Sequence, residues 1–175
     1  MNDMRTGFFL ASILLITILN ACGQSPEQTR SQADFDKMLD EMYERTVPLI
    51  KTELVSQQSP DSFIILDTRE KEEFEVSHIP GAIWVGYDNL QTDKLKTLDK
   101  EKPVLVYCSV GYRSERVGEK LQDMGFKDVQ NLYGGIFDWK HNGQTVIDSL
   151  GKSTERVHTY NKKWSQWLRV GEKVY

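Results

Sequence analysis

The stretch that most constrains the fold of this chain is residues 103–114, which read PVLVYCSVGYRS. The stretch begins with an apolar run rich in β-branched residues, and such a run predicts a buried strand. The run ends at Cys108, a short loop containing Gly111 follows, and a helical pattern of apolar residues begins near Ser114. A strand, a short loop and a helix in this order favour a parallel α/β sheet.

Cys108 lies between the predicted strand and the predicted helix. Backbone N–H groups at a helix start have no helical partner, and together with the helix dipole they favour negative charge. A thiolate at Cys108 should therefore be stabilised, and Arg113 adds a fixed positive charge. Such a loop suits Cys–S⁻ or Cys–S–S⁻ and an anionic substrate. The alternative is that Cys108 is a small core residue that closes the strand.

Apolar runs elsewhere predict further strands, and short helical patterns separate them. The predicted strands are residues 47–50, 63–66, 82–85 and 129–132. This alternation predicts one α/β domain, with a central parallel β-sheet flanked by helices. Active sites in such sheets collect at the carboxyl ends of the strands, where Asp67, Arg69 and Cys108 all lie.

Three segments of the chain carry recognisable motifs. The first is LDTRE at residues 66–70, followed by EF at 73–74 and HIPGA at 78–82. The second is VYCSVGYRS at 106–114, and the third is GF at 125–126, followed by LYGG at 132–135 and Trp139. In this order and spacing, the three segments resemble single-domain members of the rhodanese family of sulfurtransferases. The resemblance covers about residues 47–143.

The resemblance implies a role for each matching residue. Cys108 would be the nucleophile that carries a persulfide, Arg113 would close the loop, and Arg69 would face it from the neighbouring strand end. Asp67 would support the geometry of the loop or of an arginine. The anionic substrate would be held by a cradle of backbone N–H groups from Ser109, Val110, Gly111, Tyr112, Arg113 and Ser114. The implied substrates are a small sulfur-containing anion such as thiosulfate as donor, and cyanide or a thiol as acceptor.

Some of these residues have structural alternatives. Asp67 is as well placed to cap the following helix, and Arg69 to pair with Glu73 on the surface. His78 precedes Ile-Pro-Gly, so we expect it to serve in a turn and not as a base. The resemblance implies no metal or organic cofactor, since His78, His141 and His158 are scattered along the chain.

The length of the loop favours one reaction class. Four residues separate Cys108 from Arg113, whereas related folds that act on phosphate or arsenate carry one more loop residue. The shorter loop fits a sulfane sulfur, so a phosphatase or arsenate reductase is disfavoured. Ser109 and Val110 are neutral where some thiosulfate-using rhodaneses carry basic residues, so we expect thiosulfate to be a poor donor. The alternative function is a low-turnover, persulfide-carrying or thiol-binding module in the cell envelope.

Residues 1–21 resemble a bacterial lipoprotein signal peptide. Arg5 precedes an apolar run at residues 8–19, which is shorter than the roughly 20 residues a membrane-spanning helix needs. Ala21-Cys22 then resembles a lipobox, so we expect Cys22 to carry acyl chains that anchor the protein to a membrane. The alternative is an ordinary cleaved signal peptide with a soluble product. Either way, we expect the domain to lie outside the cytoplasm.

The segments around the motifs complete the predicted organisation. Residues 22–33 are polar and predict a tether, residues 34–46 predict an N-terminal helix, and residues 144–175 form a C-terminal extension. Trp164, Trp167 and Leu168 are spaced as one helix face, which favours packing onto the domain over a partner-binding motif. With a net charge of −4 and no basic block, the chain is not expected to bind nucleic acid. No protein partner is indicated.

Overall fold

A computed structural model describes residues 26–175 of the chain. The predicted signal peptide (residues 1–21), Cys22 and the first residues of the predicted tether lie outside the described residues. Across residues 26–175, none of the helices combines the length and apolar character needed to cross a membrane.

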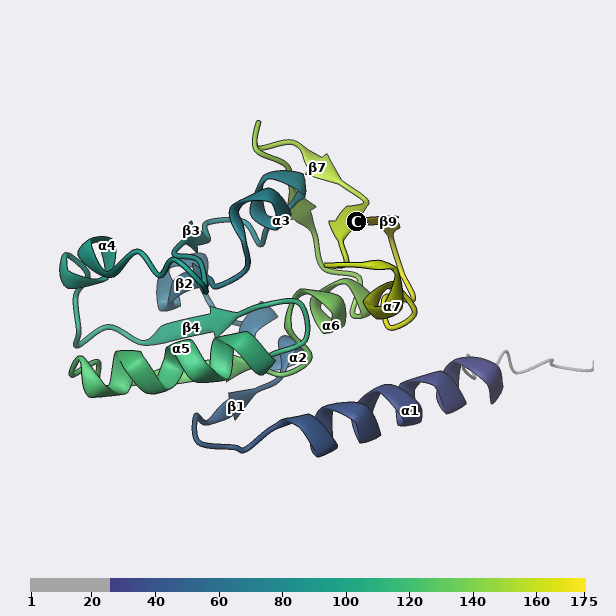
Figure 1. Cartoon of the computed structure of the whole chain (residues 1–175), viewed down its shortest axis with the longest axis horizontal. Helices are drawn as coiled ribbons and strands as arrows, with labels where there is room; N and C mark the ends of the chain where they lie inside the picture. The colour runs from purple at the N-terminus through teal and green to yellow at the C-terminus, as the bar shows by residue number, and fades with distance from the viewer. Residues whose placement is uncertain (1–25) are drawn as a thin grey trace, which may run out of the picture.

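The core of the fold is a five-stranded parallel sheet with the strand order β1-β5-β4-β2-β3 (Figure 1). Its central strand is fully buried, and an apolar, β-branched sequence is typical of a parallel strand covered on both faces. The sheet confirms the predicted parallel α/β class. The strands are β1 (Leu49–Ile50), β2 (Ile64–Asp67), β3 (Ile83–Trp84), β4 (Val104–Tyr107) and β5 (Val129–Leu132).

Helices cover both faces of the sheet. Because side chains alternate along a strand, Leu105 and Tyr107 of β4 pack against α1 and α6, whereas Val104 and Val106 pack against α4 and α5. The helices are α1 (Pro26–Met42), α2 (Thr52–Ser56), α3 (Lys71–Val76), α4 (Thr92–Lys96), α5 (Tyr112–Asp123) and α6 (Gly135–His141), with a 3₁₀ turn at Pro60–Ser62.

Two helix starts differ from the prediction. In the described part of the chain, helix α1 runs from Pro26, so it covers residues 26–33 of the segment predicted as a tether. Helix α5 begins at Tyr112, two residues before Ser114. The preceding Gly111 has a φ of 98°, a left-handed conformation that lets the chain turn from the loop directly into the helix.

The C-terminal extension packs beside α3 and α6 (Figure 1, yellow-green to yellow). Val157 and Leu168 are fully buried, and Trp164 and Trp167 pack against the same apolar core as α1. Helix α7 is a single turn, and Trp167 and Leu168 lie beyond its end. Their positions are therefore determined by burial in the core and not by helical periodicity. The extension comprises β6 (Val146–Ile147), β7 (Ser153–Thr154), β8 (Arg156–His158), α7 (Lys162–Ser165) and β9 (Glu172–Val174).

Candidate active site

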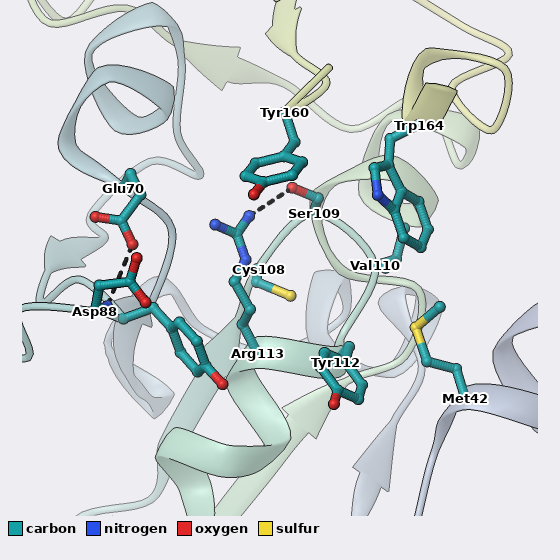
Figure 2. Close-up of a pocket in the computed structure, with 11 residues that line it drawn as sticks. Met42, Glu70, Asp88, Cys108, Ser109, Val110, Tyr112, Arg113, Tyr160 and Trp164 are labelled. Atoms are coloured by element: carbon teal, nitrogen blue, oxygen red, sulfur yellow. Dashed lines mark hydrogen bonds between the residues drawn. The ribbon is translucent and has the colours of Figure 1, made fainter. Parts of the chain in front are cut away.

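Cys108 follows directly after β4, at the carboxyl edge of the sheet. Its residue surface is only 1% exposed, yet its sulfur points into a pocket (Figure 2). The backbone N–H of Gly111, the residue that caps α5, donates a hydrogen bond to Sγ over 3.1 Å. We expected N–H groups from residues 109–114 to surround the sulfur. In the described part of the chain, Gly111 is the one of these residues whose N–H contacts it. The loop therefore directs a helix start and an N–H donor at the sulfur.

Buried side chains hold the loop in place from below. The Tyr43 hydroxyl donates to the Val110 carbonyl over 2.5 Å, and burial raises the pKa of Tyr43, so the hydroxyl stays protonated. The Asn131 amide donates to the Gly111 carbonyl over 2.9 Å, and Ser114 Oγ donates to Asn131 Oδ1 over 2.8 Å. The Ser114 side chain thus supports the loop from behind and does not face the sulfur.

Arg113 closes the loop through a carboxylate that balances its charge. Its guanidinium donates to both oxygens of Glu73, over 2.7 and 2.9 Å, and Ser109 Oγ donates to Glu73 over 3.1 Å. Burial raises the pKa of Glu73, but the hydrogen bonds and the charge of Arg113 outweigh burial and lower it overall. Both groups are therefore ionised, and the cation expected to attract substrate is already paired.

Arg69 does not line the pocket. It is fully buried and pairs with Asp67, with 2.7 Å between Nη2 and Oδ2, and it also donates to the Ser77 carbonyl over 2.6 Å. The Tyr107 hydroxyl donates to the same carboxylate over 2.6 Å. Asp67 therefore holds Arg69 in place, which is one of the two roles expected for it. The expected surface pair of Arg69 is not formed, because Glu73 binds Arg113 instead.

The position that caps α3 is occupied by Glu70 and not by Asp67. His78 serves a structural role: its ring stacks on Phe74 at 3.8 Å between centroids, and its backbone bridges to Ile147. Within residues 26–175, no group of three or more His, Cys, Asp or Glu side chains is arranged to hold a metal ion.

The pocket above Cys108 has a volume of about 430 Å³. We call the loop residues at its base, 108–113, the floor. Met42 and Trp164 form what we call the apolar wall, on the side toward which the sulfur points (Figure 2). Glu70 and Asp88 lie on the opposite side, which we call the acidic side.

Sequence reasoning did not place Met42, Tyr160 or Trp164 at this pocket. All three lie outside residues 47–143, where the motifs are found. Apolar spacing predicts that Met42 and Trp164 are buried, but it does not identify what they are buried against. The aromatic residues of the extension were the one feature of the sequence that could have indicated its contribution to the pocket. Tyr160 has a φ of 66° and lies over the Arg113 guanidinium, 5.4 Å from ring centroid to Cζ.

The geometry agrees with comparisons to known proteins. The family described as Rhodanese-like domain matches residues 51–142. Thiosulfate sulfurtransferase GlpE of Coxiella burnetii is 38% identical over 104 residues, which are 59% of this chain and 94% of that protein.

Solved structures show the same fold. The BH2092 protein of Bacillus halodurans aligns with a TM-score of 0.53 and 26% identity, over 70% of this chain and 88% of that one. The rhodanese-like domain of the Anabaena protein Alr3790 aligns with a TM-score of 0.54 at 24% identity, over 58% and 79% of the two chains. Because the Rhodanese-like domain match covers more than half of the chain, the chain belongs to the rhodanese-like family.

Proposed function

We propose that this protein is a sulfurtransferase that works through a persulfide on Cys108. The Cys108 thiolate attacks the outer sulfur of a donor such as thiosulfate, a new S–S bond forms, the donor S–S bond breaks, and sulfite leaves with the electron pair. The outer sulfur of Cys–S–S⁻ then passes to cyanide, giving thiocyanate, or to a thiolate, giving a new persulfide. The Cys108 thiolate is regenerated, so the cycle needs no oxidant or reductant.

The observation that carries this proposal is the hydrogen bond from the Gly111 N–H to the Cys108 sulfur, at the floor of a pocket. A donor fixed by the backbone stabilises negative charge on sulfur without having to reorganise during the reaction. The four residues between Cys108 and Arg113 also support it, because the family resemblance associates this loop length with a sulfane sulfur and not with phosphate. The relationship to GlpE supports the same chemistry.

A second function, a persulfide carrier with little turnover, is favoured by one observation. Glu73 already pairs with Arg113, and Ser109 and Val110 are neutral, so no free positive charge from the floor is available to a dianion. Steady-state thiocyanate production from thiosulfate and cyanide distinguishes the two functions. Multiple turnovers support the enzyme, whereas one loading of Cys108 without turnover supports the carrier. Hydrolysis of an aryl phosphate without any sulfur transfer would contradict both.

We also propose that the protein is a lipoprotein of the bacterial cell envelope, anchored through acyl chains on Cys22. The support is the lipobox-like sequence after the short apolar run. Replacing Cys22 with alanine should release the protein from membranes upon fractionation, and inhibition of lipoprotein signal processing should leave the precursor uncleaved. Unchanged membrane association of Cys22→Ala with the signal removed would contradict the anchor.

A further inference from the structure

We propose that the pocket selects an organic sulfane-sulfur donor of low charge, such as a thiosulfonate, whose hydrocarbon group packs on Trp164, over the inorganic thiosulfate dianion. This inference rests on the proposed sulfur transfer at Cys108. It assigns Trp164, in the C-terminal extension, as a specificity-determining residue for that reaction.

The shape of the pocket supports an organic group beside the reacting sulfur. The Cys108 sulfur points toward the apolar wall, formed by Met42 and Trp164 (Figure 2). A volume of about 430 Å³ falls within the range of small-molecule sites and exceeds what an inorganic anion fills. Trp164 packs on the core behind it, so its ring is held in place for contact with a ligand. Burial of an aryl group there removes apolar surface from water, which favours binding.

The charges around the pocket oppose a dianion. Glu70 and Asp88 line the acidic side, and Arg113, the one cation among the lining residues that the structure describes, is neutralised by Glu73. The Tyr160 ring lies over the Arg113 guanidinium. Arg69 cannot supply the missing charge, because it is fully buried against Asp67. Repulsion between like charges grows with the charge of the ligand, so each added negative charge weakens binding.

Such a donor can transfer its terminal sulfur to Cys108 without an oxidant or a reductant. The Cys108 thiolate forms an S–S bond with the terminal sulfur of R–SO₂–S⁻, the S–S bond within the donor breaks, and the sulfinate R–SO₂⁻ leaves with the electron pair. The products are Cys–S–S⁻ and a monoanionic sulfinate. The group R stays on the leaving fragment, which is the part of the donor that lies against the apolar wall.

Three donors separate the contributions of apolar contact and charge. Benzenethiosulfonate and methanethiosulfonate carry the same charge and differ in the aryl group, whereas thiosulfate adds one negative charge. The second-order rate constant of persulfide formation on Cys108 is measured for each, and each is divided by the rate constant of a small free thiol with the same donor. After this correction, we expect benzenethiosulfonate to exceed methanethiosulfonate at least tenfold, and methanethiosulfonate to exceed thiosulfate.

Two tryptophans of the extension provide a matched pair of variants. Trp164→Leu should reduce the corrected aryl-to-methyl ratio to near one. Trp167→Leu removes the same side chain from the same extension but lies outside the pocket lining, so the ratio should stay at its wild-type value. Asp88→Asn should raise the rate constant for thiosulfate more than that for methanethiosulfonate.

The outcomes distinguish this inference from the proposed function. If no donor loads Cys108, sulfur transfer itself is contradicted. If all three donors load it with equal corrected rate constants, or if Trp164→Leu keeps the aryl preference, sulfur transfer stands and the selectivity inference is overturned. If Trp164→Leu does not fold, the wild-type ratios and Asp88→Asn decide the question.

Discussion

The floor of the pocket and its apolar wall come from different parts of the chain. The floor, residues 108–113, lies inside the segment that matches the rhodanese-like family, residues 51–142. Met42 and Trp164 of the wall lie outside that segment, at the end of α1 and in the C-terminal extension. The family segment thus places the reacting sulfur, whereas the added segments shape the space into which a substrate must fit.

The two regions are also held in different ways. The floor is fixed by hydrogen bonds and ion pairs, among them Glu73 with Arg113 and Tyr43 with Val110. The wall is held by apolar packing of the extension on the core. Changes to the floor should therefore affect the chemistry with every donor, whereas changes to the wall should affect the choice among donors.

The largest expected effect is the loss of activity when the sulfur of Cys108 is removed. Cys108→Ser should abolish sulfur transfer with every donor, because an alcohol at this position cannot form a persulfide. The substitution is nearly isosteric, so the cooperative unfolding transition should be retained. Activity and thermal unfolding are measured side by side. Retained turnover in a folded variant would show that Cys108 is not the nucleophile.

The next largest effect is on stability and concerns the pair beneath the floor. Asp67→Asn leaves Arg69 charged and fully buried without its partner, so we expect a loss of roughly 3–5 kcal/mol in the free energy of unfolding. Burial raises the pKa of Tyr107 well above its usual value, so its hydroxyl remains a neutral donor and cannot replace the lost charge. Urea denaturation measures the change.

The matched control for this substitution is Asp93→Asn, which breaks an exposed pair with Lys96. Exposed pairs contribute little to stability, so the unfolding midpoint should not move measurably. Equal effects of the two substitutions would contradict the idea that the buried Asp67–Arg69 ion pair stabilises the fold.

A smaller effect is expected from changing the length of the floor. One glycine inserted after Gly111 should widen the loop and separate Gly111, whose N–H contacts the sulfur, from the start of α5. We expect kcat/KM for all sulfur donors to fall more than tenfold, a loss of at least about 1.4 kcal/mol of transition-state stabilisation. A glycine inserted after Gly151, in an exposed turn of the extension, is the control. Unchanged kinetics after the first insertion would show that loop length does not select the chemistry.

The smallest effect is a pH dependence of the Glu73–Arg113 pair. The pKa of Glu73 is lowered from 4.5 in the folded protein, so the unfolded state binds its proton first as the pH falls. The stability from this pair is therefore complete above about pH 4.5 and is lost as the pH falls through the lower folded value. The stability difference between wild type and Glu73→Gln should shrink below pH 4.5. A stability difference that stays constant below pH 4.5 would contradict a stabilising role of the Glu73–Arg113 pair.

The parts of the site that depend on local sequence could be predicted. Strand β4, the loop and Cys108 follow from an apolar run, a glycine and a helical pattern that are contiguous in the chain. The position of Arg69 could not be predicted, because a strand end can direct a side chain either into a pocket or into the core. Its partner Asp67 lies two residues away, and burial of the pair depends on Tyr107 of the neighbouring strand.

The apolar wall could not be predicted for a different reason. Trp164 is brought to the pocket above Cys108 by the path of the extension past α3 and α6, and no local pattern encodes that path. The helical conformation of residues 26–33 could not be predicted, because a polar stretch of this kind resembles a tether in composition.

The most direct test of the proposed chemistry is to identify the species formed on the loop cysteine. The full chain is incubated with thiosulfate, methanethiosulfonate or benzenethiosulfonate, and its mass is determined intact and by peptide mapping, so that Cys108 and Cys22 are distinguished. We expect one added sulfur atom on Cys108, removable by cyanide as thiocyanate and absent in Cys108→Ser. No added sulfur on Cys108 with any of the donors, or sulfur transfer that persists in Cys108→Ser, would contradict a persulfide mechanism at this site.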